Sequence, residues 1–234
     1  MLEPMPATLD AFRTLATYGE TSAGAELSRI GDEVHALVPT CVGVSLSLVT
    51  DAFTFTLVAD SRLARELDCV QYLDDEGPCL SAVRDNEVVA ADVEDVLDEQ
   101  QWSTFARART AEGVRSSLSL PVLVEGRVVA GVNLYASTVD AFVSHHDDLA
   151  RVCRAWQPGI VADADLTFST RDDARATPGR LQDQNHLDQA TGMLAAARGV
   201  RTDVAARRIC EAAERSGLSE GQVARVLLRV LRQH

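Results

Sequence analysis

The stretch Leu118–Tyr135, LSLPVLVEGRVVAGVNLY, is the part of the sequence that decides the fold. Apolar residues alternate with other residues on both sides of the central Glu125-Gly126. Glycine tolerates the positive φ that tight hairpin turns demand. The stretch therefore predicts two antiparallel strands joined at Glu125-Gly126.

A second strand pair is predicted upstream of this hairpin. Apolar residues alternate with small ones from Val42 to Leu48, and the same period of two recurs from Phe53 to Leu57. The polar dipeptide Thr50-Asp51 is the predicted turn between them. Before these strands, residues 23–38 carry apolar side chains at helical spacing, and Pro39 is expected to end that helix.

The remaining N-terminal segments are shorter. We expect a strand around Glu87–Ala91 and helices near 79–84, 99–112 and 145–157. The order is then helix, hairpin, short elements, hairpin, helix. This order predicts an α+β fold in which an antiparallel sheet is flanked by helices.

A boundary follows the last of these helices. Pro158-Gly159 interrupts the helical pattern, and Ser169–Arg180 is polar. We therefore predict a first domain over 1–165, a linker over 166–180 and a second domain over 181–234.

The second domain is predicted to contain three helices. Gly199 is expected to end the first, Thr202 to cap the second and Gly217 to end it. Ser219 and Gln222 have the spacing of a capping box at the start of the third. One face of that third helix is aliphatic, through Val223, Val226, Leu227, Val230 and Leu231. The opposite face carries Arg225, Arg229 and Arg232.

The charge is distributed unevenly along the chain. The net charge of the 234 residues is -13, and there is no lysine. Residues 1–180 have 14 arginines against 29 carboxylates, a charge of -15, whereas residues 181–234 have 8 against 6, a charge of +2. An acidic body repels nucleic acid, so only the C-terminal domain is expected to approach it. We find no apolar run long enough for a membrane span and no secretory signal in Met1–Thr17, and therefore expect a cytoplasmic protein without a membrane partner.

The sequence contains no recognisable catalytic or metal-binding pattern. Its 5 cysteines form no C-x-x-C pair, which argues against disulfides and structural zinc. The adjacent His145 and His146 project in different directions, so no metal site is expected. Cys79 follows Pro78 at a predicted helix start, where a thiol can become reactive, but the preceding acidic residues favour a packed side chain. Because no nucleophile elbow, P-loop or zinc-protease motif occurs, we do not expect an enzyme.

The C-terminal domain resembles the ANTAR family of RNA-binding antiterminators. The resemblance rests on Leu187–Leu194 (LDQATGML), Gly199-Val200, Ala205, Ile209 and Val223-Ala224. Three residues depart from the family pattern: Thr191 stands in place of a common lysine, Ala206 in place of an aromatic, and Cys210 precedes an acidic residue where a basic one is usual.

The ANTAR resemblance implies an RNA-binding surface, because arginine binds both phosphates and splayed bases of RNA hairpins. Its expected residues are Ala190, Thr191, Gly192, Arg198, Arg201, Arg207, Arg208, Arg215, Arg225 and Arg229. A solvated face, in which these arginines pair with nearby glutamates, is the simpler interpretation of the charges alone.

Residues 1–165 resemble a GAF domain, on the element order, the hairpin 118–135 and the sequence Glu76-Gly77-Pro78-Cys79. This resemblance implies a pocket for an unidentified small-molecule ligand between sheet and helices. Its expected lining is Tyr72, Cys79, Trp102, Phe105, Val132, Leu134 and Tyr135, although most residues of this kind are more often plain core.

The two resemblances together imply a regulator of transcription antitermination. In this hypothesis a homodimer binds structured RNA hairpins in nascent transcripts under control of the GAF-like domain. Two alternatives stay open. The second and third C-terminal helices could form a DNA-binding helix-turn-helix, although the third begins with the acidic Ser219–Gln222. Alternatively, the tail is degenerate and the protein only senses or dimerises.

Overall fold

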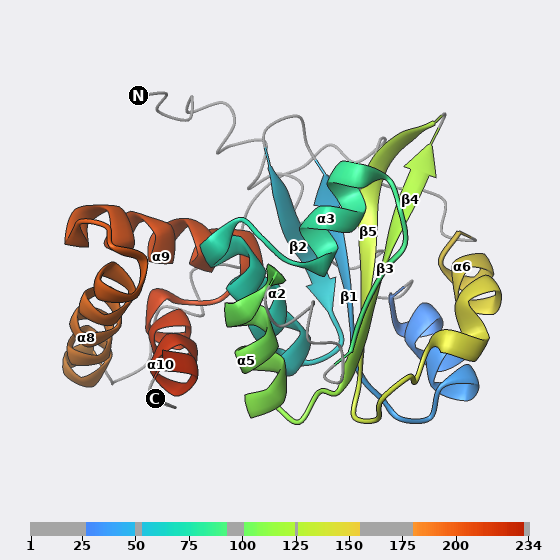
Figure 1. The fold of residues 1–234 in the computed structure, drawn as a ribbon, viewed down its shortest axis with the longest axis horizontal. Coiled ribbons are helices and arrows are strands. Elements are labelled where there is room, and N and C mark those ends of the chain that lie inside the picture. The colour runs from blue at the N-terminus through green and yellow to red at the C-terminus, as the bar shows by residue number, and fades with distance from the viewer. Residues whose placement is uncertain (1–26, 50–52, 93–100, 125, 155–179, 232–234) are drawn as a thin grey trace.

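The computed structural model describes residues 27–49, 53–92, 101–124, 126–154 and 180–231. Within them the chain forms an N-terminal α+β module, residues 27–154, and a C-terminal helical module, residues 180–231 (Figure 1). The predicted linker up to residue 179, the turn at Thr50-Asp51 and Arg232 lie outside the described residues, whereas Arg180 already belongs to a helix.

A five-stranded antiparallel sheet forms the centre of the N-terminal module. Its order is β2-β1-β5-β4-β3. The strands are β1 (Cys41–Val49), β2 (Thr54–Ala59), β3 (Val89–Asp92), β4 (Ser116–Val124) and β5 (Arg127–Ala136). The decisive hairpin is confirmed as β4–β5, in which Leu120 pairs with Val132, and Gly126 has a φ of +79°.

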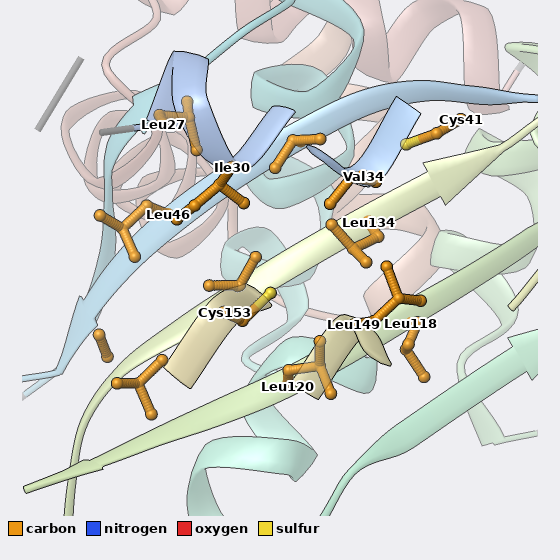
Figure 2. Packing of buried hydrophobic residues seen from close by; sticks show 14 of the residues in the cluster. Leu27, Ile30, Val34, Cys41, Leu46, Leu118, Leu120, Leu134, Leu149 and Cys153 are labelled. Atoms are coloured by element: carbon orange, nitrogen blue, oxygen red, sulfur yellow. The ribbon is translucent and has the colours of Figure 1, made fainter. Parts of the chain in front are cut away.

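One face of the sheet is covered by the first and last helices of the module. A helix over 27–37 and α6 (His146–Arg154), preceded by the short η1 (Val143–His145), pack there. Alternate residues of β1, β4 and β5 point into this layer because successive side chains of a strand face opposite sides. Figure 2 shows the resulting core, with Ile30, Val34 and Leu149 against Leu46, Leu118, Leu120 and Leu134.

The other face of the sheet is covered by α2 (Arg62–Asp74), α3 (Pro78–Asp85) and α5 (Ser103–Ala111). The sequence patterns did not predict α2, whose first turn is capped by Ser61: its Oγ accepts a hydrogen bond from the Ala64 N–H at 3.2 Å. At the junction before α3, Gly77 has a φ of +151° and no room for a Cβ, because the Gln71 side chain fills that space. The Gln71 Oε1 accepts the Cys79 N–H at 2.8 Å, which fixes the start of α3.

The helical module contains α8 (Arg180–Arg198), α9 (Thr202–Ser216) and α10 (Glu220–Leu231). The predicted stops are confirmed, since Gly199 and Gly217 have φ of +61° and +69°. The capping box is also confirmed: the Gln222 N–H donates to Ser219 Oγ at 3.2 Å, and the Ser219 N–H donates to Gln222 Oε1 at 2.8 Å. The predicted cap at Thr202 is wrong, because Arg201 is the cap and makes no side-chain capping bond.

Candidate functional site

The helical module is seated directly on the N-terminal module. Helices α9 and α10 lie against α2 and α5 (Figure 1), so α2 is sandwiched between the sheet and the helical module. Cys69, Tyr72 and Leu73 of α2 belong to the same buried cluster as the core of the three helices. Val226 and Val230 of α10 join a second cluster of the N-terminal module. The two modules therefore share a continuous apolar core.

The predicted aliphatic stripe of α10 is divided between two partners. Val223 and Leu227 pack inside the helical module, whereas Val226 and Val230 contact the cluster that contains Trp102. The stripe in the sequence is wide enough to pack on two sides of α10. One side packs in the helical module, and the other packs against the N-terminal module. Val226 and Val230 therefore dock the helical module onto the N-terminal module.

Arg215, a predicted RNA contact at the end of α9, is bound to the N-terminal module. Its Nε donates to the Thr54 carbonyl at 2.8 Å and its Nη1 to Asp75 Oδ1 at 2.6 Å. The guanidinium carbon lies 4.4 Å from the centre of the Tyr72 ring, a cation–π distance. Only 14% of the Arg215 side chain is exposed. In this arrangement Arg215 therefore contacts the N-terminal module and not the solvent.

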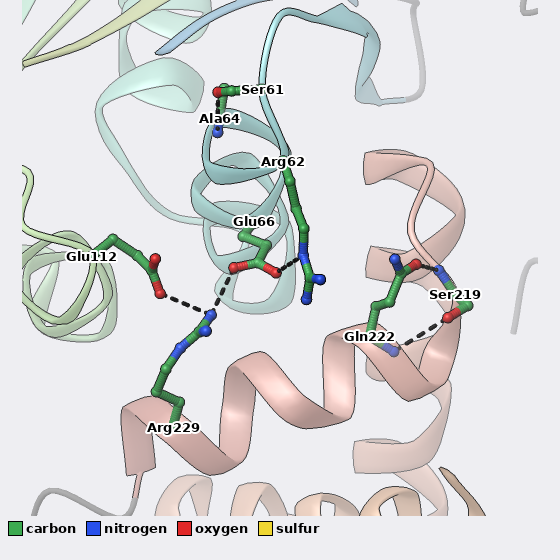
Figure 3. A network of polar contacts seen from close by, with 8 residues as sticks. All are labelled: Ser61, Arg62, Ala64, Glu66, Glu112, Ser219, Gln222 and Arg229. Atoms are coloured by element: carbon green, nitrogen blue, oxygen red, sulfur yellow. Dashed lines mark hydrogen bonds and ion pairs between the residues drawn. The ribbon is translucent and has the colours of Figure 1, made fainter. Parts of the chain in front are cut away.

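Arg229 of α10 lies between two carboxylates of the N-terminal module. Its Nη2 is 2.6 Å from Glu66 Oε2 and 2.8 Å from Glu112 Oε1, and Figure 3 shows both contacts. The other oxygen of Glu66 accepts from Arg62 Nε at 2.6 Å. Glu66 is buried, and a buried carboxylate needs such compensation. Arg229 is therefore part of an intramolecular charge cluster.

Arg198, the last residue of α8, is a third arginine that reaches across. It donates to Asp74 at the end of α2 and to the Thr104 hydroxyl of α5. Burial raises the pKa of Asp74, and the positive charges of Arg198 and Arg208 act in the opposite direction. Conversely, Arg65 of the N-terminal module contacts the helical module, because its Nη1 donates to the Ser216 carbonyl at 3.1 Å.

Two of the remaining predicted arginines pair within the helical module. Arg201 donates to Asp203 through Nε and Nη2 at 2.9 and 3.0 Å, and Arg207 lies 3.6 Å from Glu211. These pairs are exposed, so each contributes little to stability. Arg208 is half-buried near Asp74, and Arg225 is exposed on α10. Among the arginines that do not reach the N-terminal module, the exposed ones are thus Arg201, just before α9, Arg207 on α9 and Arg225 on α10.

The small residues of α8 have different surroundings. Ala190 is fully buried in the core of the three helices. Thr191 is half-buried and Gly192 is exposed. A Cβ added at Gly192 would meet no atom of the described chain within 4 Å. Close helix packing therefore does not explain this glycine, and its surface is open to an approaching molecule.

The seven predicted pocket residues do not line one site. Tyr72, Cys79, Trp102, Phe105 and Tyr135 lie on the sheet face that α2, α3 and α5 cover, or in those helices. Val132 and Leu134 face the opposite side and belong to the core of Figure 2. A single pocket lined by all seven is therefore a wrong prediction. Alternation along β5 already separates Leu134 from Tyr135, and that signal was present in the sequence.

A buried polar network occupies the helix-covered face, centred on Asp68 of α2. Asp68 accepts hydrogen bonds from Tyr135 Oη at 2.6 Å, Asn133 Nδ2 at 3.0 Å and Thr56 Oγ1 at 2.7 Å. Burial raises the pKa of this carboxyl, and the hydrogen bonds oppose the shift. Asp68 was not among the predicted site residues because it lies in α2, the helix that the sequence patterns did not predict.

Tyr72 connects this network to the helical module. Its hydroxyl lies 3.1 Å from Ser47 Oγ and 2.9 Å from Thr56 Oγ1, and the Arg215 guanidinium lies over its ring. A displacement within the polar network would therefore reach the helical module through a single side chain and its helix.

Cys79 is a packed residue in this structure. It is 1% exposed, and burial raises the pKa of its thiol to about 12, with the charge of Asp68 as the next cause. The reactive-thiol interpretation is therefore wrong for this arrangement. Among the described residues no group of His, Cys, Asp or Glu side chains could hold a metal ion, and none of the described helices is long and apolar enough to cross a lipid bilayer.

Comparison with known families and structures gives one family match. A family model described as "GAF domain" matches residues 22–152. Comparison with curated proteins finds no match.

Three solved structures are similar to this chain at low sequence identity. A type II free methionine-R-sulfoxide reductase from Thermoplasma acidophilum is 13% identical, covers 66% of this chain and 99% of its own, and has a TM-score of 0.45. A domain of a two-component sensor histidine kinase protein from Sinorhizobium meliloti is 18% identical, with 58% and 88% covered and a TM-score of 0.39. The GAF domain of a two-component sensor histidine kinase from Bacillus halodurans is 10% identical, with 56% and 90% covered and a TM-score of 0.37.

Proposed function

Because the chain belongs to the GAF domain family, we propose that it is a regulator in which this domain controls RNA binding by the helical module. The RNA would be a structured hairpin in a nascent transcript, and binding would favour antitermination. The protein would act in the cytoplasm as a homodimer and would have no catalytic role.

The observation that carries the proposal is the place of the residues that resemble the ANTAR family. Ala190, Ala205, Ile209, Val223 and Ala224 are all fully buried in one cluster. The resemblance therefore coincides with the packing of a three-helix unit, whose remaining surface carries arginines on a chain that is otherwise acidic. Arginine on a folded helical surface suits the phosphates and unstacked bases of RNA hairpins.

The regulatory input would enter at the helix-covered face of the sheet. A small molecule with hydrogen-bonding groups could replace partners within the network of Asp68, Tyr72 and Tyr135. Because α2 carries the network on one side and the helical module on the other, ligand binding there would shift the balance between two arrangements.

Direct binding measurements test the RNA proposal. The full chain would be titrated with RNA hairpins recovered by crosslinking to cellular RNA, and with duplex DNA at the same salt. We expect RNA to be preferred over duplex DNA. In a plot of log K against log salt concentration, the slope should be about −0.7 to −0.9 for each phosphate contact. Equal binding to duplex DNA would contradict the proposal.

Matched variants separate a specific surface from general charge. Arg201→Gln with Arg207→Gln removes two exposed arginines of the helical module, and the control removes Arg84 and Arg151 of the N-terminal module. Both double variants lose the same charge. We expect only the first to lose RNA affinity, by roughly tenfold or more. Equal losses in both would show that the helical module has no RNA surface there.

A second candidate function is supported by the docking itself. Three arginines of the helical module are engaged by carboxylates of the same chain, as they would be in a sensor whose tail is purely structural. Absence of RNA binding by the full chain and by every docking variant described below would favour this candidate.

A further inference from the structure

We infer that carboxylates of the GAF domain and RNA compete for the same arginines, so that the docked arrangement is the RNA-free state. The carboxylates are Glu66, Asp74, Asp75 and Glu112, named here the acidic face. The inference rests on the proposed function, because it assumes that RNA is the external partner of those arginines.

The competition follows from the geometry of three arginines. Arg198, Arg215 and Arg229 come from the last turns of α8, α9 and α10, and each binds a carboxylate of the acidic face. A guanidinium binds phosphate and carboxylate with the same N–H groups. A phosphate could therefore occupy these positions only after the carboxylates have left.

Separation of the modules, rather than a change of side-chain rotamer, is required to free Arg215. Arg215 is held on Tyr72 with a 14% exposed side chain, and its Nε is occupied by a backbone carbonyl. The apolar contacts of Cys69 and Val230 hold the helices around it. RNA contacts to Arg215 thus require undocking, so the apparent affinity for RNA that uses this arginine is reduced by the fraction of molecules that are undocked.

Neutral variants of the acidic face test the competition in the full chain. Asp74→Asn with Glu112→Gln weakens the contacts to Arg198 and Arg229. The matched control, Asp85→Asn with Asp148→Asn, changes the net charge equally but affects pairs within the N-terminal module. We expect affinity for an RNA hairpin to rise roughly fivefold or more in the first variant and clearly less in the control. Equal increases would overturn the inference.

A native thiol reports docking without reference to RNA. Cys69 of α2 is fully buried against the helical module, whereas Cys153 is buried on the opposite side of the sheet. Alkylation of each, followed by peptide mass spectrometry, should accelerate at Cys69 and not at Cys153 in the acidic-face variant. Addition of RNA to the wild-type chain should have the same selective effect. RNA that binds without changing Cys69 alkylation would overturn the inference.

A reversible crosslink gives the converse test. Ser216 of α9 lies within hydrogen-bonding reach of the Cys69 thiol. A Ser216→Cys chain, oxidised and purified as the mapped Cys69 disulfide, should lose RNA binding and regain it on reduction. RNA binding that is equal before and after reduction would overturn the inference but leave the proposed function intact. Absence of RNA binding in the wild type, the acidic-face variant and the reduced chain would instead refute the proposed function.

Discussion

Replacing Arg215 by methionine should weaken docking of the helical module, while the same change at Arg207 should not. Methionine keeps the apolar stem over the Tyr72 ring but removes every charged contact. In Arg215→Met the Thr54 carbonyl loses its donor and Asp75 loses its partner. In Arg207→Met only an exposed pair with Glu211 is lost.

The magnitude follows from the three contacts of Arg215. A hydrogen bond from a charged donor to a buried carbonyl contributes about 1.5–3 kcal/mol. The cation–π contact over Tyr72 adds about 0.5–2 kcal/mol, part of which a methionine sulfur recovers. Asp75 is largely exposed, so its pair with Arg215 contributes about 0–1 kcal/mol. Because these contributions are not fully additive, we expect a loss of about 2–4 kcal/mol for Arg215→Met and about 0.3–0.5 kcal/mol for Arg207→Met.

Alkylation of Cys69 under native conditions measures this loss. A loss of 2 kcal/mol multiplies the open fraction by roughly thirtyfold, and the alkylation rate of Cys69 should rise in proportion. The Cys153 rate should stay constant, since that thiol is buried on the other sheet face. Equal Cys69 rates in the two arginine variants would refute the energetic role assigned to Arg215.

Further predictions concern single residues. Burial raises the pKa of Asp68 above its ordinary 3.8, so the contribution of Asp68 to stability is largest below pH 3.8. That contribution is lost as the pH rises through the folded-state pKa. In urea titrations at several pH values, Asp68→Asn should remove this decline. Gly192→Ala should raise the unfolding free energy by about 0.5–1 kcal/mol and lower RNA affinity, whereas an unchanged affinity would exclude RNA approach at this surface. Ser219→Ala should cost about 1 kcal/mol by removing a cap, measured by thermal unfolding. Cys79, whose thiol pKa is about 12, should resist iodoacetamide at pH 8 until the protein is denatured, and fast native alkylation would contradict its packing.

Local sequence patterns predicted the helices and strands that have one face in the core and the other in different surroundings. The β4–β5 hairpin has one face in the core of Figure 2, and its alternation is visible in the sequence. The capping box at Ser219 and the stops at Gly199 and Gly217 depend on neighbouring residues only, so they too could be read without tertiary information.

Helix α2 was not predicted because only a narrow strip of its surface faces solvent. Nine of its residues are buried, including Glu66, Asp68 and Gln71, since the sheet lies on one side and the helical module on the other. Such a helix has polar residues at buried positions, and its apolar stripe is broken. The spacing of Leu63, Leu67 and Val70 after the capping residue Ser61 was the available signal.

The sequence by itself determined the strands and the three C-terminal helices, because these depend on residues within a few positions of one another. It also determined the charge difference between the modules, because net charge is a sum over residues. Tertiary structure alone decided which carboxylate each arginine meets. Arg198, Arg215 and Arg229 lie 124, 140 and 163 positions from their partners Asp74, Asp75 and Glu66. A Coulomb interaction depends on distance in space, and no periodicity in a sequence encodes it across such separations.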